Sequence, residues 1–80
     1  MLYLVPTPLG NLGDLSPRAQ EILQSVDWIA AEDTRITLKL LTHFAIKKPL
    51  ISYYEHNKEQ RGRELIERLQ NGETGALVTD

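Results

Sequence analysis

The sequence contains no cysteine and no long apolar run, and each absence narrows what the chain can be. Without cysteine there is neither a disulfide framework nor a thiolate metal site, which fits a reducing compartment such as the cytosol. No apolar run approaches the roughly 20 residues that a membrane-spanning helix needs. Met1 is followed directly by a short apolar run that ends at Pro6, so we expect no secretory signal peptide.

Common motifs of catalysis and nucleotide binding are also missing. There is no G-x-G-x-x-G, no phosphate-binding loop with its lysine and no G-x-S-x-G nucleophile elbow. The two histidines do not have the spacing of zinc ligands. A magnesium site at Glu32 and Asp33 is poorly supported, because neighbouring side chains at a strand end tend to point apart. We therefore predict no metal site.

What is present is a regular alternation of apolar strands and amphipathic helices in 80 residues, enough for one small globular domain. The strands are apolar throughout, which is typical of a parallel sheet that is buried on both faces. The predicted order is β-α-β-α-β-α-β, and right-handed crossovers then give a doubly wound α/β fold. The predicted strands are Leu2–Val5, Trp28–Ala31, Leu50–Tyr54 and Gly75–Thr79.

Local signals mark where the three helices begin. Ser16 is a good N-cap for the first helix and Pro17 suits its first position. Either Asp33 or Thr34 can cap the second helix, and Asn57 opens the third with the pattern of a capping box. The predicted apolar faces are Ala19, Ile22, Leu23 and Val26 in the first helix, Ile36, Leu40, Leu41 and Phe44 in the second, and Leu65, Ile66 and Leu69 in the third.

The first strand is followed by a loop rich in proline and glycine. Pro6 and Pro8 have no N–H and a fixed φ, so we expect the strand to end at Val5. Gly10 permits a positive φ or the close approach of another group. The sequence therefore predicts a stiff, exposed loop at the carboxyl end of the first strand, the edge where α/β domains bind ligands.

Polar residues follow all four predicted strands. Because the carboxyl ends of parallel strands meet at one edge of a sheet, these residues predict a functional site at that edge. The four clusters are Thr7 with Asn11, Glu32 to Arg35, Glu55 to Asn57, and Thr79 with Asp80.

The net charge of −2 hides a segregation of charge along the chain. Residues 34–63 carry seven basic and two acidic residues, whereas residues 1–33 and 64–80 are both acidic. A basic middle segment can face a polyanion. The alternative is an ordinary solvated surface of helices and loops. The basic residues of this segment are Arg35, Lys39, Lys47, Lys48, Lys58, Arg61 and Arg63.

The residues of these clusters each have a structural and a functional interpretation. Asp33 can cap a helix or accept a hydrogen bond from a ligand. Arg35 can pair with Glu32 or bind a substrate. His56 can act as an acid or base or be a solvated loop residue. The sequence leaves these alternatives open.

Four stretches in order, VPTPLGNLGDLSPRA, AAEDTR, SYYEHN and ALVTD, resemble the tetrapyrrole (corrin/porphyrin) methylase family over the whole chain. Within that family, PTPLGN and EDTR are similar to the branch that methylates small-subunit ribosomal RNA. The first loop of true tetrapyrrole methylases is typically a glycine-rich V-G-x-G-P-G, which Pro6, Thr7 and Pro8 largely replace here.

The resemblance implies a cytoplasmic, homodimeric enzyme that transfers a methyl group from S-adenosylmethionine to the ribose 2′-hydroxyl of a cytidine in 16S ribosomal RNA. It also implies two α/β domains with the methyl donor in the cleft between them. Residues 1–80 would then be an incomplete amino-terminal domain. The donor-binding loop would begin at Asp80, and the second domain would lie beyond the chain. We expect the isolated fragment to be inactive.

The resemblance and the edge of the sheet together suggest roles for single residues. A ribose hydroxyl is a poor nucleophile, so a carboxylate or histidine that accepts its proton would help. Two alternative functions compete with this one. The first is a methylase of the same family that acts on a tetrapyrrole or another small acceptor, and the second is a non-enzymatic binding domain of flavodoxin-like fold. The expected roles are catalysis for Asp33, Glu32 and His56, donor binding for Asp80 and Thr79, and substrate binding for Thr7, Pro8, Gly10, Asn11 and Arg35, with the basic segment on RNA phosphates.

Overall fold

The structure, a computed structural model, describes residues 1–7 and 14–79. Strands and helices alternate along these residues as the sequence predicts. In chain order the elements are β1 (Leu2–Pro6), α1 (Pro17–Ser25), β2 (Trp28–Ala31), α2 (Thr34–His43), β3 (Leu50–Ser52), α3 (Lys58–Gln70) and β4 (Gly75–Thr79).

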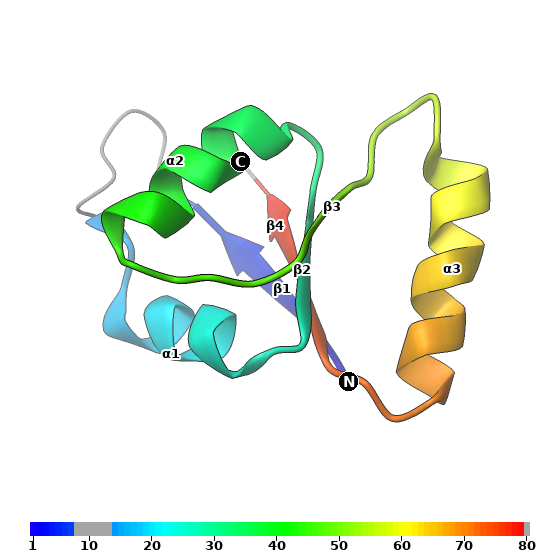
Figure 1. The fold of residues 1–80 in the computed structure, drawn as a ribbon, viewed down its shortest axis with the longest axis horizontal. Coiled ribbons are helices and arrows are strands. Elements are labelled where there is room, and N and C mark those ends of the chain that lie inside the picture. Colours follow the sequence, from blue (N-terminus) through cyan, green and yellow to red (C-terminus); the bar gives the residue numbers. More distant parts are fainter. Residues whose placement is uncertain (8–13, 80) are drawn as a thin grey trace.

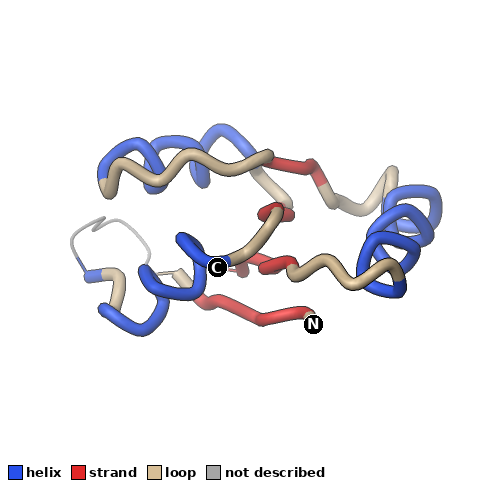
Figure 2. Tube along the Cα trace, turned by 60° about the horizontal axis from the view of Figure 1, so that its bottom comes forward, coloured by secondary structure: helices blue, strands red, loops and turns tan. Residues whose placement is uncertain are grey.

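The four strands form one parallel sheet in the order β1-β4-β2-β3. Helices α1 and α2 lie together on one face, and α3 lies apart from them on the other (Figures 1 and 2). The predicted doubly wound α/β fold is therefore confirmed. Because all strands are parallel, their carboxyl ends share one edge, and the segments after β2 and β3 are brought to the end of β4 there.

The face under α1 and α2 holds the larger apolar cluster. Its centre is made by Leu23 of α1, Ile29 of β2 and Leu41 of α2, each no more than 1% exposed. Ser16 caps α1 as predicted, because its Oγ accepts a hydrogen bond of 3.1 Å from the amide of Ala19. The helix therefore starts where the sequence places it and turns its apolar side onto the sheet.

The face under α3 holds a smaller cluster built on Trp28, Ala30 and Leu65. Trp28 is fully buried, and its indole N–H has no hydrogen-bond partner among the described residues. At 13 residues, α3 is the longest helix described. None of the helices in residues 1–7 and 14–79 is long and apolar enough to cross a membrane.

Two residues of the predicted apolar faces are exposed instead. Ile36 is 55% exposed, and Thr37 is buried in its place at the sheet side of α2. Ile66 is 56% exposed, whereas its neighbour Leu65 packs on the sheet. The reason is geometric: adjacent helical residues differ by about 100° in direction, so a face that includes Thr37 or Leu65 turns the neighbouring isoleucine to solvent.

The first strand is one residue longer than predicted. Pro6 belongs to β1 and pairs with Thr79 of β4, whereas we expected it to lie outside the ladder. β1 is an outer strand of the described sheet, and the amide of Thr7 donates to the carbonyl of Thr79 at 2.8 Å. Because successive residues of a strand point their amides to opposite sides, the missing N–H of Pro6 is on the side away from β4 and costs no ladder hydrogen bond.

Candidate functional site

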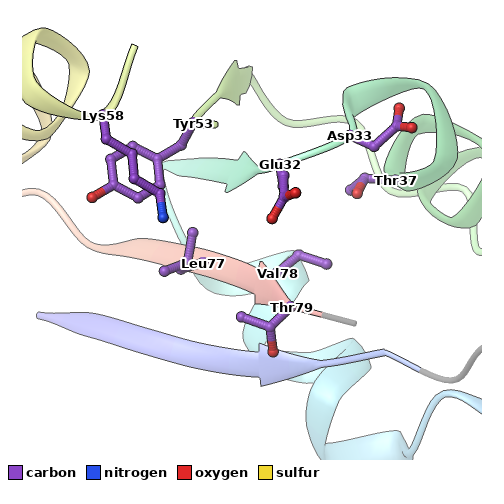
Figure 3. A pocket seen from close by; sticks show the side chains of 8 residues that line it. All are labelled: Glu32, Asp33, Thr37, Tyr53, Lys58, Leu77, Val78 and Thr79. Carbon is purple, nitrogen blue, oxygen red and sulfur yellow. The ribbon is translucent and has the colours of Figure 1, made fainter. Parts of the chain in front are cut away.

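A pocket of about 320 Å³ opens at the carboxyl edge of the sheet (Figure 3). Glu32 follows β2, Asp33 precedes α2 and Thr79 ends β4. The predicted meeting of Glu32 and Asp33 with Thr79 is therefore confirmed. The remaining lining residues are Thr37, Tyr53, Lys58, Leu77 and Val78.

Glu32 directs its carboxylate into this pocket, toward the strand that carries Val78 (Figure 3). Within the described part of the chain, this carboxylate has neither a hydrogen-bond donor nor a cation in contact. No group of three or more potential metal-ligating side chains lies together in residues 1–7 and 14–79. An unpartnered carboxylate in a pocket is free to accept hydrogen bonds from a ligand or to take up a proton.

Asp33, in contrast, is the N-cap of α2 and points its carboxylate toward the helix (Figure 3). Its Oδ1 accepts hydrogen bonds from the amides of Arg35 at 3.0 Å and Ile36 at 3.4 Å. Desolvation raises the pKa of this carboxyl, but these bonds and the Arg35 side chain outweigh it and hold the pKa below its ordinary value. Asp33 is thereby a weaker proton acceptor than an ordinary aspartate.

Arg35 pairs with Asp33, not with Glu32 as the structural interpretation of the sequence had it. Its Nε lies 3.5 Å from Oδ1 of Asp33, and its side chain is 90% exposed. The difference follows from the cap, because the carboxylate that already bonds the amide of Arg35 is also the one nearest its side chain. Arg35 thus keeps most of its guanidinium available to solvent or a ligand.

The loop after β1 is tied to the end of β4 at its start. Thr7 donates its hydroxyl to the carbonyl of Thr79 at 3.1 Å, alongside the amide bond to the same oxygen. This double contact brings one predicted substrate residue next to one predicted donor residue. Apart from Arg35, the other predicted residues of these two groups, Pro8, Gly10, Asn11 and Asp80, lie outside the described residues.

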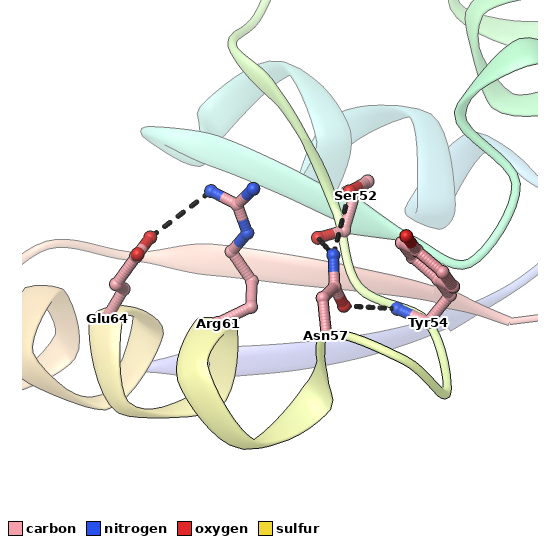
Figure 4. Close-up of polar contacts among 5 residues, drawn as sticks. All are labelled: Ser52, Tyr54, Asn57, Arg61 and Glu64. Carbon is pink, nitrogen blue, oxygen red and sulfur yellow. Dashed lines mark hydrogen bonds and ion pairs between the residues drawn. The ribbon is translucent and has the colours of Figure 1, made fainter.

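Asn57 shapes the connection from β3 to α3 in a way that the sequence did not predict (Figure 4). Its side-chain oxygen accepts from the amide of Tyr54 at 2.8 Å, and its nitrogen donates to the carbonyl and Oγ of Ser52 at 3.1 and 3.0 Å. The predicted capping box is wrong, because this side chain makes no cap bond to α3. The same turn ends β3 at Ser52, two residues earlier than expected.

His56 lies on this turn but does not line the pocket that contains Glu32 and Asp33. It is exposed, and its ring meets that of Tyr54 edge to face, with centroids 6.0 Å apart. Among the described residues, Glu32 is therefore the predicted catalytic candidate with a carboxylate directed into the pocket and no partner of its own.

The pocket also contains two polar residues whose role the sequence did not indicate. Lys58, at the start of α3, lies over the ring of Tyr53 at 5.9 Å from its centroid and 3.6 Å from the carboxylate of Glu55. Thr37 is a buried polar residue of α2. The signal for Lys58 was its position just after the third polar cluster, but a lysine at a helix start is common on any surface.

The structure separates two groups within the basic segment, and Lys39 and Arg63 belong to neither. Arg35, Lys58 and Arg61 surround the carboxyl edge, where they line depressions. Lys47 and Lys48 precede β3, next to Pro49, whose carbonyl accepts from the amide of Ile29 near the start of β2. These two lysines therefore stand at the opposite, amino end of the sheet.

Several relatives match this chain over at least 99% of its length. A Synechocystis protein is 61% identical over all 80 residues, a Bacillus subtilis protein 58% over all 80, and an Escherichia coli O157:H7 protein 53% over 79 residues, or 99% of the chain. Each is named ribosomal RNA small subunit methyltransferase I. The chain spans 29%, 27% and 28% of the length of these three relatives.

The family-level comparison agrees with the fold. The sequence profile described as Tetrapyrrole (Corrin/Porphyrin) Methylases matches residues 1–80, which include all four strands and all three helices of the structure. This match covers the same four stretches that carry the resemblance in the sequence. The chain therefore belongs to the tetrapyrrole (corrin/porphyrin) methylases.

Proposed function

We propose that the protein containing this chain is an S-adenosylmethionine-dependent methyltransferase that modifies the 2′-hydroxyl of a cytidine in 16S ribosomal RNA of the small subunit. The observation that carries the proposal is the identity of 53–61% to proteins named for small-subunit ribosomal RNA methylation. The chain spans less than a third of these relatives, so we further propose that segments outside it complete the donor site. A homodimer in the cytoplasm is part of the same proposal.

The edge pocket suits both the methyl donor and a ribose. When bound, S-adenosylmethionine supplies an electrophilic methyl group on a positively charged sulfur. The unpartnered carboxylate of Glu32 is compatible with a ligand that brings positive charge or hydroxyl groups. Thr79 would contact the donor from the end of β4, and Thr7 would contact the substrate beside it.

The reaction gives Glu32 the role of proton acceptor. Methyl transfer is a displacement in line with the acceptor oxygen, so the site must orient the ribose hydroxyl and take its proton. Among the described residues the Glu32 carboxylate has no partner in the pocket, whereas Asp33 has committed one oxygen to the cap of α2 and has a lowered pKa. Asp33 then positions Arg35 and the helix start. His56, outside the pocket, would contact substrate at its margin.

The test is a methylation assay with the intact protein. Small ribosomal subunits that lack the modification are incubated with methyl-labelled S-adenosylmethionine, and the RNA is digested to nucleosides. Label in 2′-O-methylcytidine is the expected result. Donor binding without label in RNA would move the activity to a small acceptor, and a protein that does not bind the donor would end the proposal.

The proton-acceptor role is tested in the same assay with two variants of matched chemistry. Glu32→Gln keeps the size and shape of the side chain and removes its basicity, so we expect a loss of about 10²- to 10⁴-fold in rate. Asp33→Asn keeps a capping side chain and should lose clearly less. A Glu32→Gln enzyme that is as fast as the wild type would exclude this glutamate as the base.

A further inference from the structure

The edge pocket continues into a groove that runs to the free side of β3. Glu32 and Asp33 line the edge pocket and also a second depression of about 510 Å³. Thr34, Arg35 and Ser52 line this second depression and also a third of about 510 Å³. Since each depression shares walls with the next, together they form one surface, which we call the β3 groove. It leads from Glu32 to Arg61.

The charge of the β3 groove changes sign along its length. Its pocket end carries Glu32 and Asp33, Arg35 follows in the middle beside Asp33, and its far end carries Arg61. Arg61 lies 3.2 Å from Glu64, but both side chains are over a third exposed, and such pairs contribute little free energy. A phosphate can therefore compete for the guanidinium groups, which bind it with paired hydrogen bonds.

The middle of the β3 groove offers an exposed aromatic ring. Tyr54 is 41% exposed, lines the second depression and meets His56 edge to face. Exposed tyrosine and histidine rings stack on the bases of single-stranded RNA, and this contact tolerates any sequence. Tyr54 shares its depression with Glu32, Asp33 and Arg35, so a base stacked on it would lie beside a sugar at the carboxylates and a phosphate at the guanidinium.

Hydrogen bonds hold the wall of the β3 groove in place. Figure 4 shows Asn57 and Arg61 rising side by side from the start of α3 toward Ser52. Asn57 bonds both Ser52 and the amide of Tyr54, so the strand end and the aromatic residue are fixed relative to each other. Since the Oγ of Ser52 accepts from Asn57, its own proton remains available for a phosphate oxygen.

We propose that the β3 groove binds single-stranded RNA next to the nucleotide that is methylated. The ribose hydroxyl lies at Glu32, a neighbouring base stacks on Tyr54, and phosphates contact Arg35 and Arg61. The opposite order is unfavourable, because a phosphate at the acidic end would be repelled by two carboxylates. This inference rests on the proposed function and specifies which surface of the chain holds the RNA.

The test compares two double variants of the intact protein that remove the same charge. Arg35→Gln/Arg61→Gln alters the β3 groove, whereas Lys47→Gln/Arg63→Gln alters the amino end of the sheet and the exposed residue that pairs with Glu59 at 4.0 Å. Binding of a fluorescent single-stranded RNA of mixed sequence is measured by anisotropy at several salt concentrations. We expect the groove variant to bind at least about tenfold more weakly, with the salt slope reduced by about 1.4 for two lost contacts. The control variant should stay near wild type.

The aromatic contact is tested separately, with a conservative variant that guards against misfolding. Tyr54→Ala should weaken binding about tenfold without changing the salt slope, and Tyr54→Phe should restore it. If the intact protein binds RNA but both groove variants bind like wild type, or the control loses as much as the groove variant, the groove assignment is wrong. If the wild type neither binds nor methylates RNA, the proposed function is wrong, and so is the proposal that the groove binds RNA.

Discussion

The two faces of the sheet are packed to very different degrees. Among the described residues, the cluster under α1 and α2 contains eleven buried residues, and the cluster under α3 contains three. An apolar depression of about 130 Å³ remains between the sheet and α3, and Leu4 of β1 is 67% exposed. Strands with similar apolar content thus support one closely packed face and one that a single helix covers only in part.

The difference bears on how the candidate site is assembled. Asp33 caps α2, on the closely packed face, and Glu32 follows the fully buried strand β2. Lys58 and Arg61 belong to α3, which covers its face with fewer buried contacts. Regions with few buried apolar contacts open locally at lower free energy than the core. Glu32 and Asp33 are therefore held more firmly than Lys58 and Arg61, so these two basic residues can adjust to a ligand.

The largest expected effect comes from comparing the loss of stability caused by one truncation on each face of the sheet. Leu23→Ala removes a fully buried side chain of α1 and should cost about 2–5 kcal/mol of unfolding free energy. Ile66→Ala removes a side chain of α3 that is 56% exposed, so its cost should stay within about 0.5 kcal/mol. Urea unfolding of the intact protein measures both. Equal losses would show that α3 is packed more tightly than its exposure indicates.

A smaller effect tests whether the α3 face is loose everywhere. Gly75 of β4 lies between Leu2 and Trp28, and a Cβ at this position would overlap the six-membered ring of the buried Trp28. Gly75→Ala should therefore cost about 1–3 kcal/mol through overpacking.

The control for this substitution is a second glycine, Gly62, which belongs to α3 itself. A Cβ at Gly62 would meet the ring of Tyr53 at 3.7 Å, an ordinary contact, and alanine is the better helix former. Gly62→Ala should stabilise by about 0.5–1 kcal/mol. If Gly75→Ala is equally harmless in thermal unfolding, Trp28 has room to move and the packing beneath it is loose as well.

Sequence reasoning predicted most of the fold because the relevant signals are local. Each apolar run is followed by residues that stop a strand, and Ser16 and Asp33 mark helix starts. Topology alone predicts that the candidate site lies at the carboxyl edge of the sheet, since parallel strands bring their carboxyl ends together. The order β1-β4-β2-β3 was not predicted, because it depends on long-range pairing that no single segment encodes.

The errors arose where one side chain had two comparably good alternatives. Asn57 can cap α3 or bond Ser52 and Tyr54, and the second choice satisfies more polar groups at once. Glu32 and Asp33 looked equivalent in the sequence, and only the direction of each carboxylate distinguishes the free one from the cap. Lys58 was overlooked as a pocket residue because an exposed lysine carries no local signal of what it faces.

The smallest expected effect compares the starts of the helices on the two faces. Asp33 caps α2 with its side chain, whereas Asn57 makes no such bond to α3. The pKa of Asp33 is lowered in the folded protein, so its ionised form stabilises the fold at neutral pH. That contribution is complete above the unfolded pKa of about 3.9 and is lost as the pH falls through the lower, folded pKa.

Asp33→Asn keeps the cap but removes the charge, so the variant should be slightly less stable than wild type at pH 7. In unfolding curves of both proteins this difference should shrink below about pH 4. A difference that is independent of pH would mean that the charge of Asp33 contributes nothing and that its hydrogen-bond geometry alone holds the start of α2.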